Sequence, residues 1–248
     1  MQLQKIVKRL AITGLITLSF TSCAQSNQID SKQFTAQLAK SLSAEHLYKY
    51  MFLEAAANET VTYAEHSITF NISPNQARLH SGIRSELSID YPYQLGQTVS
   101  YSFEMKVPDD FQNDKKNRWS LFAQWHDQPN PERGETWQNF PGNSPPVSLF
   151  TESQQGVFGI GIDYGGVNRE WVPLSKGQWH RFQFRFLWSN KQDGRLTVAL
   201  NDETRFFFTG ANMLNDFQHY LKIGLYRHSK IPTRNQISFK ALDIKTIK

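Results

Sequence analysis

The sequence predicts an all-β protein, a sandwich or jelly roll built from two antiparallel sheets. Aromatic residues make up 13% of the 248 residues, which suits sheets whose faces carry rings better than a helical bundle. From about residue 60 onward, short segments of alternating apolar and polar residues are separated by clusters of Gly, Pro, Asn and Asp. Many short strands at such spacing, with no helical segments between them, are typical of this fold class.

Composition and charge exclude several other classes of protein. Apolar residues at 39% and charged residues at 20% supply a sizeable core and exclude wholesale disorder. The formal net charge is +5. Removal of an N-terminal segment that holds three basic residues leaves 24 basic against 22 acidic residues, or +2. We expect no nucleic-acid partner, since this excess is weak and no nucleic-acid-binding motif is present.

Residues 1–22 have the three-part pattern of a secretory signal peptide, with a basic start, an apolar stretch over residues 10–20 and two small residues. Cys23, the only cysteine, follows directly, so no intramolecular disulfide can form. Residues 18–23 resemble the lipobox of bacterial lipoproteins, in which the cysteine is acylated, although Phe20 replaces the usual Leu. We therefore expect a lipoprotein anchored in the cell envelope through Cys23. An ordinary cleaved signal peptide is the alternative.

Residues 23–59 are expected to form a tether and an N-terminal segment. The stretch 24–37 is polar, as a tether from a membrane anchor should be. In residues 38–57, apolar side chains recur at spacings of three and four, which favours a short amphipathic helix, while the aromatic residues would equally suit an early strand. The domain that carries the chemistry is then expected over residues 60–248.

Ten segments of this domain are predicted to be strands, each alternating in polarity and bounded by turn residues. In residues 179–188, Phe182, Phe184, Phe186 and Trp188 share one face, which places that face in the core. Asp193 and Gly194 then begin a turn into a hairpin partner. The ten segments are 61–72, 83–89, 98–107, 119–126, 147–150, 156–164, 179–188, 196–200, 220–227 and 237–247.

Three of the predicted strands carry chemically active side chains on one face. The faces hold Arg84, Glu86 and Ser88 on the first strand, Gln124 and His126 with Phe122 on the second, and Tyr220, Lys222, Gly224, Tyr226 and His228 on the third. On the second strand, Leu121, Ala123 and Trp125 are expected to point the other way. If the three strands share a sheet, these polar groups converge on one concave surface.

The same three strands resemble the motifs of a known enzyme family. Arg84-Ser-Glu-Leu87, Gln124-Trp-His126 and Tyr220-Leu-Lys-Ile-Gly-Leu-Tyr226 resemble, in this order, the three motifs of jelly-roll alginate lyases. Gly177-Gln-Trp-His-Arg181 with Asp193-Gly-Arg-Leu196 looks closer still to the heparin lyase I and glucuronan lyase group. The resemblance covers about residues 61–248. It implies a concanavalin A-like jelly roll and an endolytic lyase that cleaves a uronate-containing anionic polysaccharide (glucuronan, alginate or a heparin-like chain) by β-elimination.

The residue types fit that chemistry. β-Elimination removes the C5 proton of a uronate and expels the C4 oxygen, so the charge of the carboxylate must first be offset. Arg84 and Gln124 suit that task through bidentate pairing and amide donors. His126 can act as a base near neutral pH. Tyr226 can donate a proton to the leaving oxygen, or serve as both acid and base.

The other polar residues of these strands are expected to bind the substrate or to orient the catalytic residues. Lys222 lies on the same strand face as Tyr226, where it could stabilise the phenolate. Glu86 is grouped with the binding face but is expected to orient Arg84 rather than to touch sugar. Tyr220 and His228 complete the expected substrate-binding set.

Two other functions compete with this interpretation. A non-catalytic carbohydrate-binding module of the same sandwich type would stack its aromatic rings on sugars, but it would not need the His, Tyr and Lys cluster. A sandwich glycoside hydrolase would need a pair of carboxylates flanking the bond, and the predicted face offers only Glu86. No zinc-ligand, dinucleotide or nucleophile-elbow motif is present. No cofactor or catalytic metal is therefore expected, no loop indicates structural calcium, and a monomer is expected.

Overall fold

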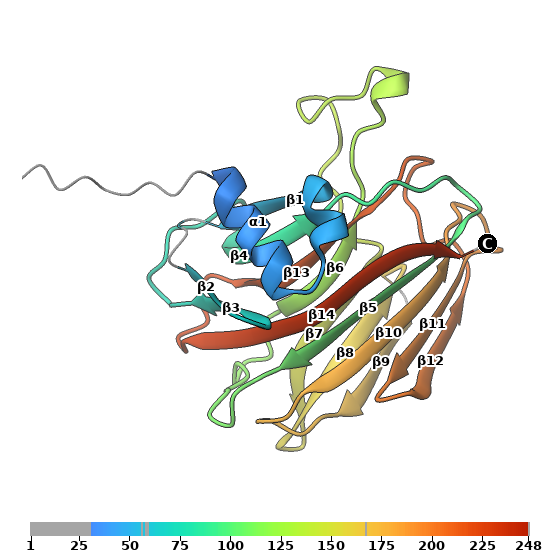
Figure 1. The fold of residues 1–248 in the computed structure, drawn as a ribbon. Coiled ribbons are helices and arrows are strands. Elements are labelled where there is room, and N and C mark those ends of the chain that lie inside the picture. Colours follow the sequence, from blue (N-terminus) through green and yellow to red (C-terminus); the bar gives the residue numbers. More distant parts are fainter. Residues whose placement is uncertain (1–30, 56, 58–59, 167, 248) are drawn as a thin grey trace, which may run out of the picture.

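A computed structural model describes residues 31–55, 57, 60–166 and 168–247. The predicted signal peptide and Cys23 lie outside the described residues. Two antiparallel sheets of seven strands each pack face to face, as Figure 1 shows. This arrangement confirms the predicted all-β sandwich of two antiparallel sheets.

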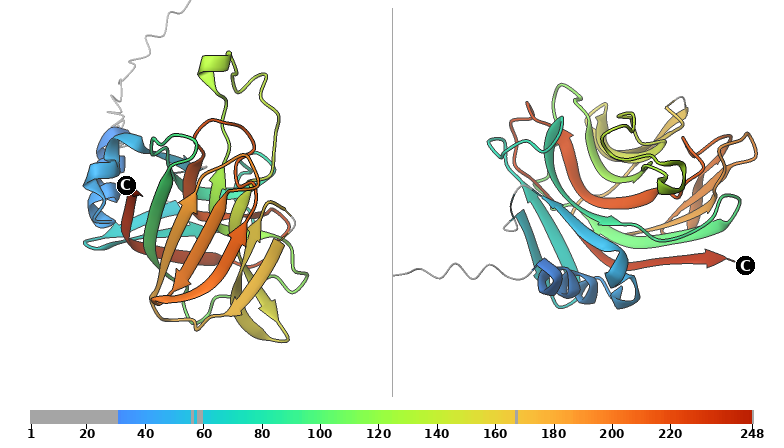
Figure 2. Two further views of the ribbon diagram at one scale, coloured as in Figure 1. Left: turned by 90° about the vertical axis from the view of Figure 1, so that its right-hand side faces the viewer. Right: turned by 90° about the horizontal axis from the view of Figure 1, so that it is seen from above.

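One sheet, called here the cleft sheet, carries the predicted site on its outer face. Its strands, in spatial order, are β1 (Met51–Ala55), β4 (Gly82–Ile89), β13 (Tyr220–His228), β6 (Ser120–His126), β7 (Val147–Gln154), β8 (Val157–Tyr164) and β9 (Asn168–Pro173). The other, called the back sheet, has the order β12 (Glu203–Thr209), β11 (Arg195–Leu200), β10 (His180–Leu187), β5 (Thr98–Lys106), β14 (Asn235–Ile247), β3 (Ser67–Ile72) and β2 (Val61–Ala64). Both sheets bend in the same sense, with the cleft sheet on the inner side of the bend (Figure 2).

Aromatic side chains fill the space between the sheets. The Trp125 ring of the cleft sheet lies with its centroid 4.9 Å from that of Phe184 and 4.8 Å from that of Phe186, both on the back sheet. Phe182, Phe184, Phe186 and Trp188 are all buried, which confirms the predicted core face of β10. Burial of these rings is a major stabilising contribution because each removes a large apolar area from water.

The N-terminal segment differs from the predicted helix over residues 38–57. The helix α1 spans Ser31–Ser41 and ends where Ser43 adopts a positive φ of 55°. A 3-10 helix η1 (Glu45–Tyr50) follows, and then strand β1, which pairs with β4. The predicted helix was therefore wrong over Met51–Ala55, where the alternative of an early strand is correct, because backbone pairing with β4 outweighs the helical spacing.

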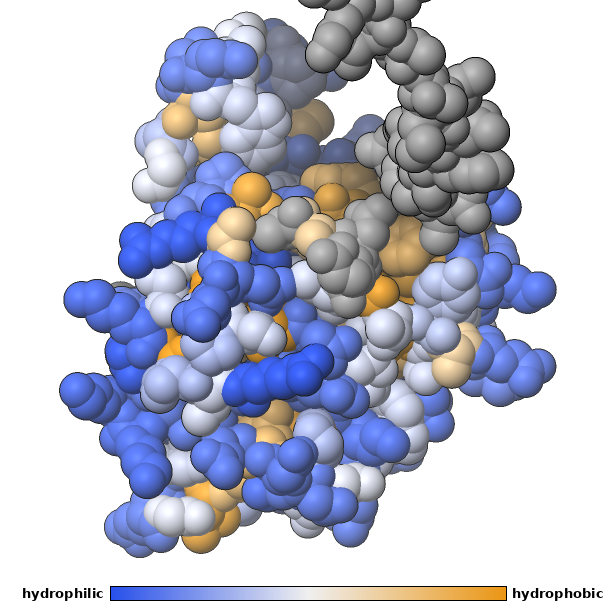
Figure 3. All heavy atoms as spheres, turned by 90° about the vertical axis from the view of Figure 1, so that its left-hand side faces the viewer, coloured by the Kyte–Doolittle hydropathy of each residue, from blue (hydrophilic) through white to orange (hydrophobic). Residues whose placement is uncertain are grey.

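The face seen from the α1 side of the molecule is mainly polar. The helix α1 packs against β1, β2 and β3, and its apolar residues include the buried Phe34 and Leu38. Polar side chains cover most of the surface on this side (Figure 3). Within the described part of the chain, no helix combines the length and the apolar character needed to cross a membrane.

Strands β9 and β12 were not predicted from the sequence, and one segment predicted as a single strand forms a hairpin. The missed strands β9 and β12 are edge strands, and they are rich in polar residues because each pairs on one side only. The predicted strand over residues 61–72 is divided into β2 and β3 by a turn at Glu65 and His66. The remaining predicted strands are present with shifts of a few residues at their ends.

A β-bulge in β6 reverses part of the predicted pattern. The pairing of β6 with β7 shifts between Leu121 and Ala123. Phe122 therefore points into the core, with its ring centroid 6.0 Å from that of Phe182, while Leu121 lines the outer cleft. The predicted faces of Phe122 and Leu121 were wrong because an extra residue breaks the period of two.

Candidate active site

A cleft of about 1500 Å³ lies on the outer face of the cleft sheet. Most of the polar residues singled out in the sequence line this cleft, although they come from three strands far apart in the chain. These residues are Arg84, Gln124, His126, Tyr220, Lys222, Tyr226 and His228. The predicted convergence on one surface is therefore what the structure shows.

Strand register brings these side chains together. Opposite residues of an antiparallel pair share a face, so paired positions form rows across β4, β13 and β6. The rows are Arg84, Tyr226 and Leu121; Ser88, Lys222 and Gln124; and Tyr220 and His126. The predicted base thus lies one row beyond Gln124, and the predicted acid lies directly opposite Arg84.

Gly224 permits the close pairing of β13 with β4 between these rows. Its φ is 141°, a conformation that side chains rarely adopt, and a Cβ there would overlap the backbone carbonyl of Ser85. The register of β13 with β6 shifts between Ile223 and Tyr226 at the same place. A residue with a side chain would force β13 away from β4 where the site is built.

Glu86 lies beneath the cleft and orients two of the predicted catalytic residues. Its side chain is 0% exposed. One of its oxygens lies 3.1 Å from Nε of Arg84, and the other accepts a hydrogen bond of 2.7 Å from Nε2 of Gln124. Burial raises the pKa of Glu86. Glu86 therefore acts on Arg84, as expected, and on Gln124, but it cannot reach a sugar.

Glu54 of β1 is a central residue that the sequence analysis missed. It pairs with Nη1 of Arg84, lies 2.8 Å from Nζ of Lys222, and accepts a 2.6 Å hydrogen bond from Ser88. Burial opposes ionisation of Glu54, but Lys222, Ser88 and Arg84 outweigh it and lower its pKa from 4.5 to about 2. Since Glu54 and Glu86 are directly opposite in register, the two cations also relieve their repulsion.

The lowered pKa of Glu54 predicts how the stability of the fold depends on pH. Glu54→Gln should destabilise the fold at neutral pH by about 1–3 kcal/mol, because buried donors lose a charged partner. A lowered pKa contributes stability that is present above pH 4.5 and lost as pH falls toward 2. The difference between wild type and variant, measured by denaturant unfolding, should therefore shrink over that interval.

A surface carboxylate provides the matched control for this measurement. Glu104 pairs with Lys240 at 3.1 Å on the back sheet, and Glu104→Gln should change stability by less than about 1 kcal/mol at any pH. A difference for Glu54→Gln that stays constant between pH 5 and pH 2 would contradict the assigned ion pairs.

Asp127, also missed in the sequence, orients His126. Nδ1 of His126 lies 2.7 Å from Oδ1 of Asp127, and Asn143 donates a 2.7 Å hydrogen bond to the other oxygen. Burial opposes the ionisation of Asp127, but the contacts with His126 and Asn143 outweigh it and lower the pKa of Asp127. With Nδ1 engaged, Nε2 of His126 is left for a substrate, and the carboxylate can stabilise the imidazolium that forms when Nε2 takes a proton.

The cation over the Tyr226 ring is Arg84, not Lys222. The guanidinium carbon of Arg84 lies 4.0 Å from the centroid of that ring. Nζ of Lys222 lies instead 4.9 Å from the Tyr220 ring centroid and pairs with Glu54. The predicted pairing of Lys222 with the Tyr226 phenolate was therefore wrong, because Glu54 draws Lys222 toward β1.

The Tyr226 hydroxyl lies at the rim of the cleft. It forms a 2.6 Å hydrogen bond with the Ser81 hydroxyl, and the Trp119 ring packs against its own ring at 4.7 Å. The candidate base His126, the candidate acid Tyr226 and the buried cation of Arg84 thus line one cleft. In the described residues, no group of three or more His, Cys, Asp and Glu side chains could hold a metal ion.

A family model described as "Polysaccharide lyase" matches residues 53–240. The chain belongs to the polysaccharide lyase family. The match begins within β1, so the strand that carries Glu54 is part of it. No curated protein matches the sequence.

Solved lyase structures share the fold of this polysaccharide lyase. An endo-β-1,4-glucuronan lyase from the fungus Trichoderma reesei superposes with a TM-score of 0.56 at 14% identity, over 79% of this chain and 87% of that one. The alginate lyase AlyC3 gives 0.60 at 13% identity, over 90% and 98%. The alginate lyase AlyA1 from Zobellia galactanivorans gives 0.54 at 14%, over 77% and 82%. At such identities the likeness shows the fold alone, and family membership favours an enzyme over the binding-module alternative.

Proposed function

We propose that this polysaccharide lyase cleaves a uronate-containing anionic polysaccharide by endolytic β-elimination. The observation that carries the proposal is the placement of His126 and Tyr226 on one face of adjacent strands, with Gln124 one row from His126 and Arg84 directly opposite Tyr226. The names of the similar structures, which are glucuronan and alginate lyases, support a uronate substrate. The cleft is complete within one chain, which supports action as a monomer.

The substrate carboxylate binds to Arg84 and Gln124 in this proposal. Glu86 holds both donors by hydrogen bonding and charge, so their orientation is set before substrate arrives. Neutralising the carboxylate makes the C5 proton more acidic and stabilises the enolate-like intermediate. Lys222 and Tyr220 bind the sugar beside this centre, and His228 lies at the rim near Trp119.

Proton transfer then completes the elimination. Nε2 of His126 takes the C5 proton, the electrons of that C–H bond form the C4–C5 double bond, and the C4–O bond breaks. The Tyr226 hydroxyl gives its proton to the departing oxygen. Arg84, stacked on the Tyr226 ring, stabilises the resulting phenolate, and Asp127 stabilises the imidazolium.

A panel of uronate polymers tests this function. Incubation with alginate, glucuronan, heparin-like chains and uronate heteropolymers should give ultraviolet absorbance from the new C4–C5 double bond with at least one of them. Endolytic cleavage should lower the mean chain length early, before small products accumulate. If the protein binds these polymers but forms no unsaturated product from any of them, the proposed lyase activity is contradicted and the binding-module alternative is supported.

We propose further that the chain is a lipoprotein of the cell envelope, anchored through Cys23. The lone cysteine at the end of an export signal supports this proposal. Labelling with a fatty-acid analogue should modify the wild-type chain, and Cys23→Ser should abolish both the label and co-sedimentation with membranes. Equal labelling of the two proteins would contradict the anchor.

A further inference from the structure

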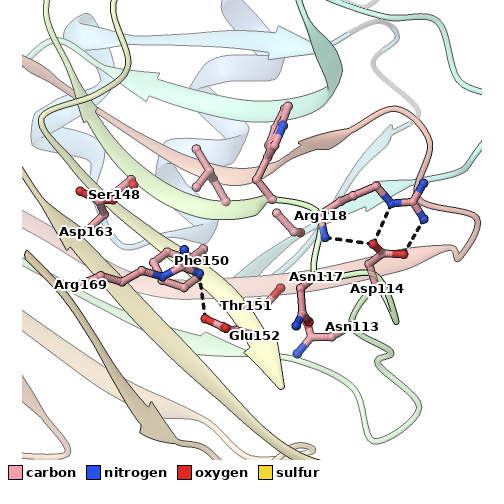
Figure 4. A pocket seen from close by; sticks show the side chains of 13 residues that line it. Asn113, Asp114, Asn117, Arg118, Ser148, Phe150, Thr151, Glu152, Asp163 and Arg169 are labelled. Carbon is pink, nitrogen blue, oxygen red and sulfur yellow. Dashed lines mark hydrogen bonds and ion pairs between the residues drawn. The ribbon is translucent and has the colours of Figure 1, made fainter. Parts of the chain in front are cut away.

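The cleft continues into a second pocket over β6, β7, β8 and β9. This pocket has a volume of about 170 Å³ and shares Trp119, Leu121, Ser148 and Asp163 with the main cleft. Its other side chains include Arg118, with Asp114, and Arg169, with Glu152 (Figure 4). The two pockets form one groove, called here the substrate groove, which crosses the cleft sheet from β1 to β9.

Every lysine and arginine among the described residues that line the substrate groove is already paired with a carboxylate. These pairs are Arg84 with Glu54, Lys222 with Glu54 at 2.8 Å, Arg118 with Asp114 at 2.6 Å, and Arg169 with Glu152 at 2.8 Å. Figure 4 shows the last two pairs within the second pocket. The lining holds these four cations against four carboxylates, Glu54, Asp114, Glu152 and Asp163.

Asp163 is the carboxylate of this lining that no lysine or arginine pairs with among the described residues. It accepts a hydrogen bond of 2.8 Å from the backbone nitrogen of Gly166. In strand register it follows Gln124 and Ser148 across the sheet, and Arg169 comes next. At the usual spacing of about 4.8 Å between strands, Asp163 lies about 10 Å from Gln124. Asp163 therefore faces a neighbouring sugar, not the sugar that reacts.

Beyond Asp163, the arginines that line the second pocket already have carboxylate partners. The guanidinium carbon of Arg169 lies 4.0 Å from the Phe150 ring centroid, and its nitrogen is held by Glu152. Gly161 lies directly opposite Phe150 in register, and a Cβ there would overlap the Phe150 ring. The Phe150 ring is itself buried, so the exposed group at this position is the Arg169 guanidinium, whose charge Glu152 balances.

We infer that the preferred substrate is a heteropolymer in which uronates are separated by neutral sugars, rather than a run of adjacent uronates. This inference rests on the proposed β-elimination. In the groove lining, Arg84 and Lys222 share the single carboxylate of Glu54, so this centre keeps donors for one substrate carboxylate. A second substrate carboxylate farther along the groove would lie near Asp163 and near Arg169, whose charge Glu152 already neutralises. Repulsion between that carboxylate and Asp163 discriminates against a run of adjacent uronates.

A graded series of one polymer tests this inference. Polyglucuronate whose carboxyl groups are reduced to neutral glucose in increasing fractions keeps the same backbone and linkage. The value of kcat/KM per remaining uronate, followed by ultraviolet absorbance, should rise as neighbours become neutral. A constant or falling value would overturn the inference while leaving β-elimination intact. Absence of unsaturated product from this series and from alginate, heparin-like and alternating uronate heteropolymers would overturn the proposed function, and this inference with it.

Charge variants give a second measurement on the same polymers. Asp163→Asn and Glu152→Gln should each raise kcat/KM on unreduced polyglucuronate by about 3–10-fold at low salt, because each removes a repulsive charge. The gain should shrink at high salt and on the reduced polymer. Glu170→Gln is the matched control, since Glu170 lies on β9 opposite the core residue Ile162 and lines neither pocket. Equal rates for Asp163→Asn, Glu152→Gln and wild type on every polymer would overturn the inference.

Discussion

Tyr226→Phe is expected to lower kcat by about 10²–10⁴-fold, the usual cost of a lost general acid or base. The substitution removes one oxygen and keeps the ring, so the contacts with Trp119 and with the Arg84 guanidinium remain. Polymer binding should survive because the cations and aromatic residues of the groove are unchanged. Product formation by ultraviolet absorbance and binding by calorimetry measure the two effects separately.

The control for this variant removes a hydroxyl elsewhere. Tyr63 lies exposed on β2 of the back sheet, and Tyr63→Phe should leave kcat unchanged. If Tyr226→Phe kept full activity, the proposed mechanism would be wrong. If it lost polymer binding instead of turnover, the hydroxyl would serve in recognition and another group would be the acid.

His126→Ala is expected to lower kcat by a comparable factor of about 10²–10⁴ if the C5 proton needs its own base. Asp127→Asn should cost less than His126→Ala, since it leaves the imidazole in place but weakens the stabilisation of its charged form. Single-turnover rates on the best polymer from the panel measure both effects.

A second histidine paired with a carboxylate provides the matched control. His46 lies 3.3 Å from Asp243 on the surface, and His46→Ala should leave the rate unchanged. Loss of activity in Tyr226→Phe with full activity in His126→Ala would assign both proton transfers to Tyr226 and contradict the role of His126.

The site residues on regular strands could be predicted from the sequence, because alternation fixes which side chains share a face. Arg84, Gln124, Lys222 and Tyr226 all lie on the predicted faces. Leu121 and Phe122 were assigned wrongly because a bulge leaves no local trace in the polarity pattern.

Glu54 and Asp127 were missed in the sequence for physical reasons as well. Glu54 lies in a segment whose spacing also suits a helix, and only its pairing with β4 decides that it is a strand. Asp127 follows the end of β6, where alternation stops, so no pattern marks its contact with His126. Which cation serves which group, Arg84 over Tyr226 and Lys222 on Glu54, depends on contacts between distant strands. The polarity pattern of a single strand cannot predict contacts of this kind.

The position of β13 between β4 and β6 has a consequence for how the protein folds. Residues 220–228 form a central strand of the cleft sheet, yet they lie near the C-terminal end of the sequence. Until they are inserted, β1 and β4 have no neighbour in common with β6 to β9, and the cleft sheet exists as two separate pieces with unpaired edges. Contacts of such long sequence separation make folding slow. Recovery of lyase activity during refolding should therefore lag behind the formation of the β10–β11–β12 meander. A chain truncated before residue 220 loses β13 and also β14, which lies between β5 and β3 in the back sheet, so it should have two interrupted sheets and no active site.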